Sequence, residues 1–251
     1  MERAAALLRR RRVVAAAALL LALAVYYWAV GTLDGPPRLW LAFLLVSTGL
    51  VPAVFALVWL ALPLRARRGT LALAVAFALL AAVWSRAGLD VAANFAKLAA
   101  AAALAFWFLS YFERLSWVVL VAAMIPLVDA FSVWRGPTRH IVTEEPQVFD
   151  ALSFAFPVGG EASFDLGLPD ILFFSLFLGA AARWGLRVGW TWAAMVASFG
   201  VTMALALWVD PFGIGGLPAL PGLSFAFLLA NADLLWRELR TPAPPDPEPP
   251  S

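Results

Sequence analysis

Runs of apolar residues long enough to cross a lipid bilayer recur along the whole of this sequence. A hydrocarbon core roughly 30 Å thick requires about 20 residues of helix, and a helix satisfies its own backbone hydrogen bonds there. Eight stretches meet or approach this length: residues 13–30, 39–62, 71–84, 91–112, 117–134, 168–183, 190–209 and 217–236. Because 63% of the 251 residues are hydrophobic and only 14% are charged, a soluble domain is excluded. We predict an all-α, polytopic transmembrane helix bundle of about eight spans.

The first apolar run follows the basic segment ERAAALLRRRR, residues 2–12, which also suits the start of a secretory signal. The run is long for a signal, however, and the bulky side chains of Tyr26, Tyr27 and Trp28 precede the weakly cleavage-like residues 29–31. We therefore favour an uncleaved membrane anchor, with a cleaved signal as the alternative.

The arginines gather at alternate ends of the expected helices. If the N-terminus is cytoplasmic, the outer loops carry only Arg38, Arg86, Arg135 and Arg139. The cytoplasmic segments then carry the remaining arginines: Arg3, Arg9, Arg10, Arg11, Arg12, Arg65, Arg67, Arg68, Arg114, Arg183, Arg187, Arg237 and Arg240. With eight helices, this bias predicts that both termini are cytoplasmic. The single lysine, Lys97, is expected to snorkel to the outer interface.

Composition divides the chain into four expected segments. These are a basic cytoplasmic N-terminus (1–12), a four-helix membrane region (13–112), a second membrane region (113–236) containing the polar loop 135–166, and a proline-rich acidic tail (237–251). The tail cannot form a core and is expected to be disordered. Within the loop, HIVT (140–143) and ALSFAF (151–156) have strand-like compositions and predict a short hairpin.

Several kinds of chemistry lack the residues that they need. The chain has no cysteine, which excludes disulfides, thiol nucleophiles and cysteine metal sites. It has no HExxH motif and no phosphate-binding glycine loop, and its one histidine, His140, lies in the polar loop, away from any serine within the membrane. The arginines fit membrane orientation rather than nucleic-acid binding. We expect no metal, no cofactor and no nucleic-acid partner.

Two aspartates remain that solvation does not readily explain. Asp129 lies about a turn and a half from the end of the fifth expected helix, and Asp170 lies in the first turn of the sixth. Because the fifth helix runs outward and the sixth returns, both carboxylates fall at a similar depth, about 5–8 Å inside one boundary. Carboxylates within a span are costly and usually face a cavity or a partner, although either one alone could merely cap a helix. A facing pair can share a proton and activate water, or relay protons in a transporter.

The last expected span opens with the sequence GGLPALPGL, residues 215–223. Pro218 and Pro221 interrupt backbone hydrogen bonding there. Irregular backbone at membrane depth is tolerated beside protein or a water-filled cavity. The segment is either a simple proline turn before a helix or one wall of a cleft.

Together these segments resemble the presenilin and signal-peptide-peptidase family of intramembrane aspartyl proteases. Val128-Asp129, Gly167-Leu168-Pro169-Asp170 and Pro218-Ala219-Leu220 occur in the order of that family's three motifs. The resemblance covers about 45 residues, and the first four helices share only hydropathy with the family. It implies that Asp129 and Asp170 are catalytic, and that Gly167, Leu168, Pro169, Pro218, Ala219 and Leu220 shape a cleft for transmembrane protein or peptide substrates in a prokaryotic cell membrane.

Two substitutions separate this chain from the family pattern. Val128 replaces a tyrosine beside the first aspartate, and Pro169 replaces the glycine before the second. The family also has nine helices, and here the loop between the aspartates is expected to face outward, as in the signal-peptide-peptidase branch. An intramembrane aspartyl endopeptidase is the leading hypothesis; a proton- or cation-coupled transporter and a non-catalytic family member are the alternatives.

Overall fold

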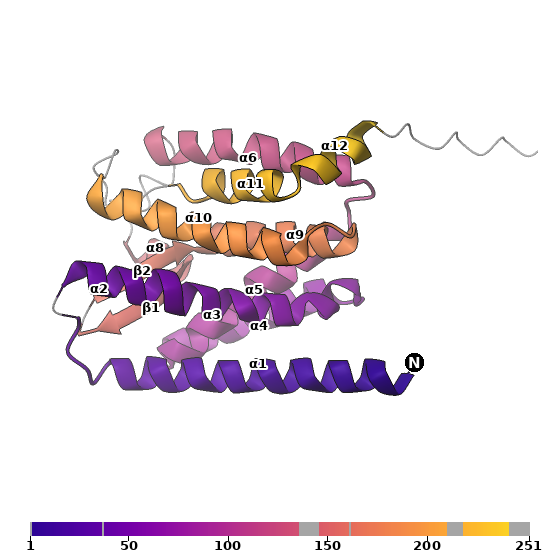
Figure 1. The fold of residues 1–251 in the computed structure, drawn as a ribbon. Helices are drawn as coiled ribbons and strands as arrows, with labels where there is room; N and C mark the ends of the chain where they lie inside the picture. The colour runs from indigo at the N-terminus through magenta and orange to yellow at the C-terminus, as the bar shows by residue number, and fades with distance from the viewer. Residues whose placement is uncertain (1, 37, 136–145, 161, 210–217, 241–251) are drawn as a thin grey trace, which may run out of the picture.

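The computed structural model describes residues 2–36, 38–135, 146–160, 162–209 and 218–240 (Figure 1). The main helices are α1 (Glu2–Val30), α2 (Leu39–Leu44), α3 (Val51–Ala61), α4 (Thr70–Arg86), α5 (Asp90–Leu109), α6 (Leu115–Arg135), α9 (Leu168–Arg183), α10 (Val188–Trp208), α11 (Leu220–Ala230) and α12 (Ala232–Arg240). Each of the eight predicted spans overlaps helical structure among the described residues. Four helical stretches are long and apolar enough to cross a membrane: Arg10–Val30, Leu39–Ala66, Asp90–Leu109 and Val188–Trp208.

The second span is helical but irregular. A π-helical turn, η1 (Leu45–Leu50), joins α2 to α3, and a short 3-10 turn, η2 (Leu62–Ala66), follows α3. Pro52 lies in the first turn of α3, where it cannot donate a backbone hydrogen bond to the preceding turn. The wider π turn just before it accommodates this break. The span therefore contains a local widening that hydropathy alone does not reveal.

The C-terminal prediction requires two corrections. The expected eighth span, 217–236, is not one helix: α11 ends at Ala230, Asn231 forms a turn, and α12 begins at Ala232. Residues 237–240, assigned to the disordered tail, form the end of α12. The break arises because the Asn231 side chain is fully buried and donates hydrogen bonds to Thr191 Oγ1 (2.8 Å) and the Phe227 carbonyl (2.9 Å).

The helices lie roughly side by side, with α1 at one side of the bundle and α6 at the other (Figure 1). Helix α5 packs against α4 and α9, while α11 packs against α10 and α6. Fully buried aromatic rings fill the interior between them. Phe55 of α3 stacks on Phe199 of α10, with ring centroids 4.9 Å apart, and Phe177 of α9 stacks on Phe227 of α11 at the same distance. This packing sets the position of α9, which carries Asp170.

A two-stranded antiparallel hairpin lies at the end of the bundle where α1 finishes (Figure 1). The short helix α8 (Pro146–Ala151) leads into β1 (Ser153–Gly159), which pairs with β2 (Ala162–Gly167). A hairpin was predicted, but its strands were misplaced: residues 151–156 overlap β1, whereas the second strand is 162–167. Residues 140–143 and His140 lie outside the described residues. The true second strand, ASFDLG, was missed because its apolar residues are few.

Candidate active site

Asp129 lies on α6, one helical turn after Pro126, and its side chain is partly buried. Its Oδ2 accepts a hydrogen bond from the backbone N–H of Leu220, at 3.3 Å. Leu220 is the first residue of α11, where the amide groups have no partner within the helix. The carboxylate of one helix thus binds the N-terminus of another.

Asp170 is the third residue of α9, and β2 runs into this helix without an intervening loop. Gly167 is the N-cap, and its backbone amide interacts with the Asp170 carboxyl group. This resembles half of a capping box, in which an acidic side chain at the third position reaches back to the N-cap amide. A Cβ atom on Gly167 would lie 3.1 Å from Asp170 Oδ2. Glycine is therefore the residue that lets this carboxyl group approach the backbone.

The two carboxylates are close enough for their charges to interact. Their helices, α6 and α9, pack against each other and against α11. Asp170 lies in the first turn of α9 and Asp129 binds the first residue of α11, so each carboxyl group is beside a helix N-terminus, where partial positive charge favours an anion. Such an arrangement permits a shared proton, because two like charges at close range do not both ionise easily. It also permits a plainer role, in which each carboxylate caps one helix.

The segment Pro218-Ala219-Leu220 is placed at this junction. Pro218 is partly buried, Ala219 and Leu220 are buried, and Ala219 is the N-cap of α11. The structure thus brings this motif to Asp129, through the amide of Leu220. The segment therefore leads into the N-terminus of α11, and its role as the wall of a cleft stays a prediction.

The remaining motif residues occupy distinct environments. Leu168 packs against the hydrophobic core, and Pro169 is exposed in the first turn of α9. Proline is well suited to this turn, because its missing N–H would have no helical partner there. Val128, which stands where the family has tyrosine, is 65% exposed on α6. Its side chain therefore lies outside the packed interior of the bundle.

Lys97 of α5 reaches the hairpin. Its Nζ donates hydrogen bonds to the backbone carbonyls of Asp150 and Ser153, at the start of the hairpin, and its position at the outer interface stays a prediction. These bonds form because the hairpin folds over α5 and presents carbonyl groups that the ammonium can reach.

Sequence reasoning also missed Asn94, which is buried one turn earlier on the same helix. Its Nδ2 donates to the Ala155 carbonyl (2.9 Å), and its Oδ1 accepts from the Ala155 amide (3.0 Å). An amide side chain within an apolar helix was the available signal, because such groups inside a membrane normally have partners.

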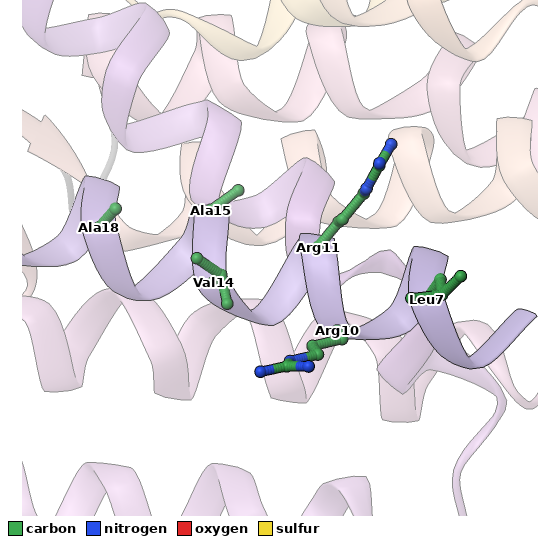
Figure 2. A pocket seen from close by; sticks show the side chains of 6 residues that line it. All are labelled: Leu7, Arg10, Arg11, Val14, Ala15 and Ala18. Carbon is green, nitrogen blue, oxygen red and sulfur yellow. The ribbon is translucent and has the colours of Figure 1, made fainter. Parts of the chain in front are cut away.

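A hollow of about 310 Å³ lies elsewhere, along the first half of α1. All its lining residues belong to that one helix: Leu7, Arg10, Arg11, Val14, Ala15 and Ala18 (Figure 2). Figure 2 shows the guanidinium groups of Arg10 and Arg11 pointing to different sides of the helix. The hollow is therefore a groove on an isolated helical face, and it contains no acidic group.

No family model matches this chain, and no curated protein is significantly similar to it.

Proposed function

We propose that this protein is an intramembrane aspartyl endopeptidase whose catalytic pair is Asp129 and Asp170. The observation that carries the proposal is that α6, α9 and α11 pack together, with Asp129 near enough to Asp170 for their charges to interact and bound to the amide of Leu220 in Pro218-Ala219-Leu220. The residues come from distant parts of the sequence, yet they form one polar site in an apolar bundle.

The proposed reaction is hydrolysis of a peptide bond by activated water. One ionised carboxylate takes a proton from water while the protonated carboxyl group donates a hydrogen bond to the peptide carbonyl oxygen. The water oxygen bonds to the carbonyl carbon and forms a tetrahedral intermediate. The C–N bond then breaks as a proton passes to the leaving nitrogen. The pair ends the cycle with one proton, as it began, and no cofactor takes part.

The proposed substrate is a transmembrane segment that becomes extended near the site. Strand β2 supports this mode of binding, because among the described residues it has only β1 as a neighbouring strand and because it leads directly to Asp170, whose carboxyl group interacts with the Gly167 amide. An extended peptide can add to such an edge through main-chain hydrogen bonds. Gly167, Leu168 and Pro169 form the end of this edge and the beginning of α9.

For the membrane topology, we propose eight crossings with both termini in the cytoplasm of a prokaryotic cell. Three of the helices involved, Thr70–Arg86, Leu115–Asp129 and Leu220–Ala230, are shorter apolar helices. Each of these helices can cross the membrane if residues of the segments on either side of it span the remaining thickness of the bilayer. This topology places the hairpin and both aspartates toward the outer face of the membrane.

The test is cleavage of a transmembrane reporter peptide by purified protein in detergent or liposomes. Asp129→Asn and Asp170→Asn should each reduce cleavage by at least about a thousandfold, since each member of a catalytic unit is needed. Asp233→Asn, which alters an exposed acid at the other end of α11, is the matched control and should cleave normally. Equal cleavage by all three variants and wild type would refute the proposal.

A non-catalytic protein that binds membrane segments is the second candidate. Two observations favour it: Pro169 stands where the family has glycine, and both aspartates interact with backbone amides at helix starts. Under this hypothesis the wild type binds the reporter without cutting it, and Pro169→Gly restores cleavage. A transporter would instead show pH-linked flux in liposomes, which both aspartate substitutions would abolish.

A further inference from the structure

The outer edge of β1 is bound by side chains from two membrane helices. Asn94 of α5 makes two hydrogen bonds with the backbone of Ala155, as described above. Tyr27 of α1 donates a third to the same residue, with its Oη 2.8 Å from the Ala155 carbonyl. Asn94 and Tyr27 are each only 7% exposed. The Ala155 backbone is thus fully satisfied by side chains rather than by a third strand.

Two further side chains extend this pattern along the strand. Tyr26 of α1 donates to the Pro157 carbonyl (2.9 Å), and Lys97 of α5 donates to the Ser153 carbonyl (3.1 Å). The bound carbonyls are those of alternate residues, as expected for one edge of a strand. Pro157 is tolerated at this edge because it has no N–H to satisfy. We call Tyr26, Tyr27, Asn94 and Lys97 the edge clamp.

The edge clamp determines which edge of the hairpin remains open. The backbone carbonyls of Ser153, Ala155 and Pro157 point toward the edge clamp. Because successive residues of a strand direct their backbone groups to opposite sides, the amides and carbonyls of Phe154 and Phe156 face β2. Their partners are Leu166 and Phe164.

On β2, the residues between these partners direct their backbone groups away from β1. These residues are Ser163 and Asp165, and Gly167 continues the series. The Gly167 amide interacts with Asp170, so this open edge ends at a proposed catalytic carboxyl group.

We propose that the edge clamp is a set of positioning residues that directs a substrate strand to β2 and fixes its register relative to Asp170. This inference rests on the proposed proteolytic function. Three successive contacts connect the edge clamp to Asp170. Lys97 binds Ser153, Ser153 pairs with Gly167, and Gly167 is the N-cap of α9, the helix that carries Asp170. A shift of β1 by one residue would reverse the faces of the hairpin and misplace the open edge.

The first test compares Asn94→Leu and Asn94→Asp with wild type, using mass spectrometry of the products from the reporter peptide. Asn94→Leu removes the two hydrogen bonds that Asn94 makes with the Ala155 amide and carbonyl. The rate of reporter cleavage should then fall about tenfold, and products cut at new positions should appear. Asn94→Asp keeps the acceptor but loses the donor, so its effect should be intermediate. Unchanged cleavage positions in Asn94→Leu would overturn the inference while leaving the proposed function intact.

The matched control is Asn231→Leu. Asn231 is also a buried asparagine with hydrogen bonds to backbone and side-chain groups, but it lies at the α11–α12 turn. This variant should lose stability as Asn94→Leu does, yet cut the reporter at the wild-type positions. New cleavage positions in Asn231→Leu would attribute the change to general destabilisation and overturn the inference.

Hydrogen–deuterium exchange supplies a readout that does not require cleavage. With the reporter peptide bound to Asp170→Asn, backbone amides of Ser163 and Asp165 should gain protection, whereas the Ala155 amide should already be protected without peptide. Protection gained at β1, or none at β2, would overturn the inference. If the wild-type protein gains protection at β2 on binding the peptide but does not cleave it, the proposed proteolytic function is refuted, whereas the inference about strand binding stands.

Discussion

At the scale of single residues, the position of Asp170 depends on the absence of a side chain three residues earlier. Gly167 has φ −59°, which any residue can adopt, so glycine is not required for backbone conformation. Space is the tighter constraint, because a Cβ atom would lie 3.1 Å from the Asp170 carboxyl oxygen, which would have to shift by a few tenths of an ångström. Glycine at position 167 thus leaves room for the Asp170 carboxyl group next to the backbone.

Gly167→Ala should therefore displace the Asp170 carboxyl group by a few tenths of an ångström. We expect cleavage of the reporter to fall about tenfold without loss of folding, because catalytic groups tolerate little misplacement. Gly31→Ala is the control, since a Cβ there would have no heavy atom within 4 Å. If both variants cut at the wild-type rate, the close approach of Gly167 and Asp170 is not important for activity.

At the scale of elements, the contact between α5 and α9 connects the hairpin to the candidate site. Helix α5 holds β1 through Asn94 and Lys97, and it also packs along α9. Gly179 permits the close approach of α9: a Cβ atom there would lie 2.9 Å from Leu109 Cδ2 and 3.4 Å from Phe106 Cε1. Both neighbours are buried, so neither side chain can easily move aside.

Gly179→Ala should destabilise the protein by about 1–3 kcal/mol through overpacking, against a gain of about 1 kcal/mol in helix propensity. The measurement is thermal unfolding in detergent, followed by circular dichroism. Gly200→Ala is the matched control, because its Cβ would make an ordinary 3.7 Å contact with Ser47 Cβ. A stabilised Gly179→Ala variant would contradict the predicted closeness of the two helices.

The attachment of α12 depends on an ion pair that responds to pH. Arg187, just before α10, donates two hydrogen bonds to the Asp233 carboxylate, at 2.6 and 2.7 Å. These bonds hold the pKa of Asp233 below its usual value. The pair therefore stabilises the docked helix above the unfolded-state pKa of about 4, and this contribution is lost as the pH falls through the folded-state pKa.

In the Asp233→Asn variant, the stability of the folded protein should consequently depend less on pH in the acidic range. We expect the unfolding temperature of wild type to fall more steeply than that of the variant as the pH is lowered from roughly 6 to 3. Glu113→Gln, which removes another exposed acid, is the comparison and should retain the wild-type slope. Identical profiles for wild type and Asp233→Asn would show that the pair contributes nothing measurable, as is common for exposed ion pairs.

At the scale of the whole molecule, the absence of cysteine allows the proposed topology to be mapped directly. Single cysteines at Thr32 and Ser163 should react with a membrane-impermeant maleimide on intact cells, because both lie on the proposed outer face. Ser110→Cys should react only after permeabilisation, because four helices precede it. Labelling of Ser110→Cys on intact cells would mean that the first four helices do not all cross.

Most of the predicted helices overlap the observed ones because the information for them is local. The sixth predicted span, 168–183, has the bounds of α9, and the third, 71–84, differs from α4 by one residue at its start and two at its end. A run of apolar residues indicates a segment that can face lipid, and such a segment is helical because a helix satisfies all its backbone hydrogen bonds internally. The corrections, by contrast, concern features that depend on remote partners: the break at Asn231, which binds Thr191, and strand β2, which pairs with β1.

The apolar sequence is therefore sufficient to specify a helical membrane protein and to single out Asp129, Asp170 and the Pro218 segment as unusual within it. Only the folded chain determines that Asp129 binds the Pro218 segment, and that β2 rather than β1 keeps an open edge. The physical reason is sequence separation. Asp129 meets an amide 91 residues away, and Tyr27 meets a carbonyl 128 residues away. Such contacts depend on how the helices pack, which no local pattern of hydropathy encodes.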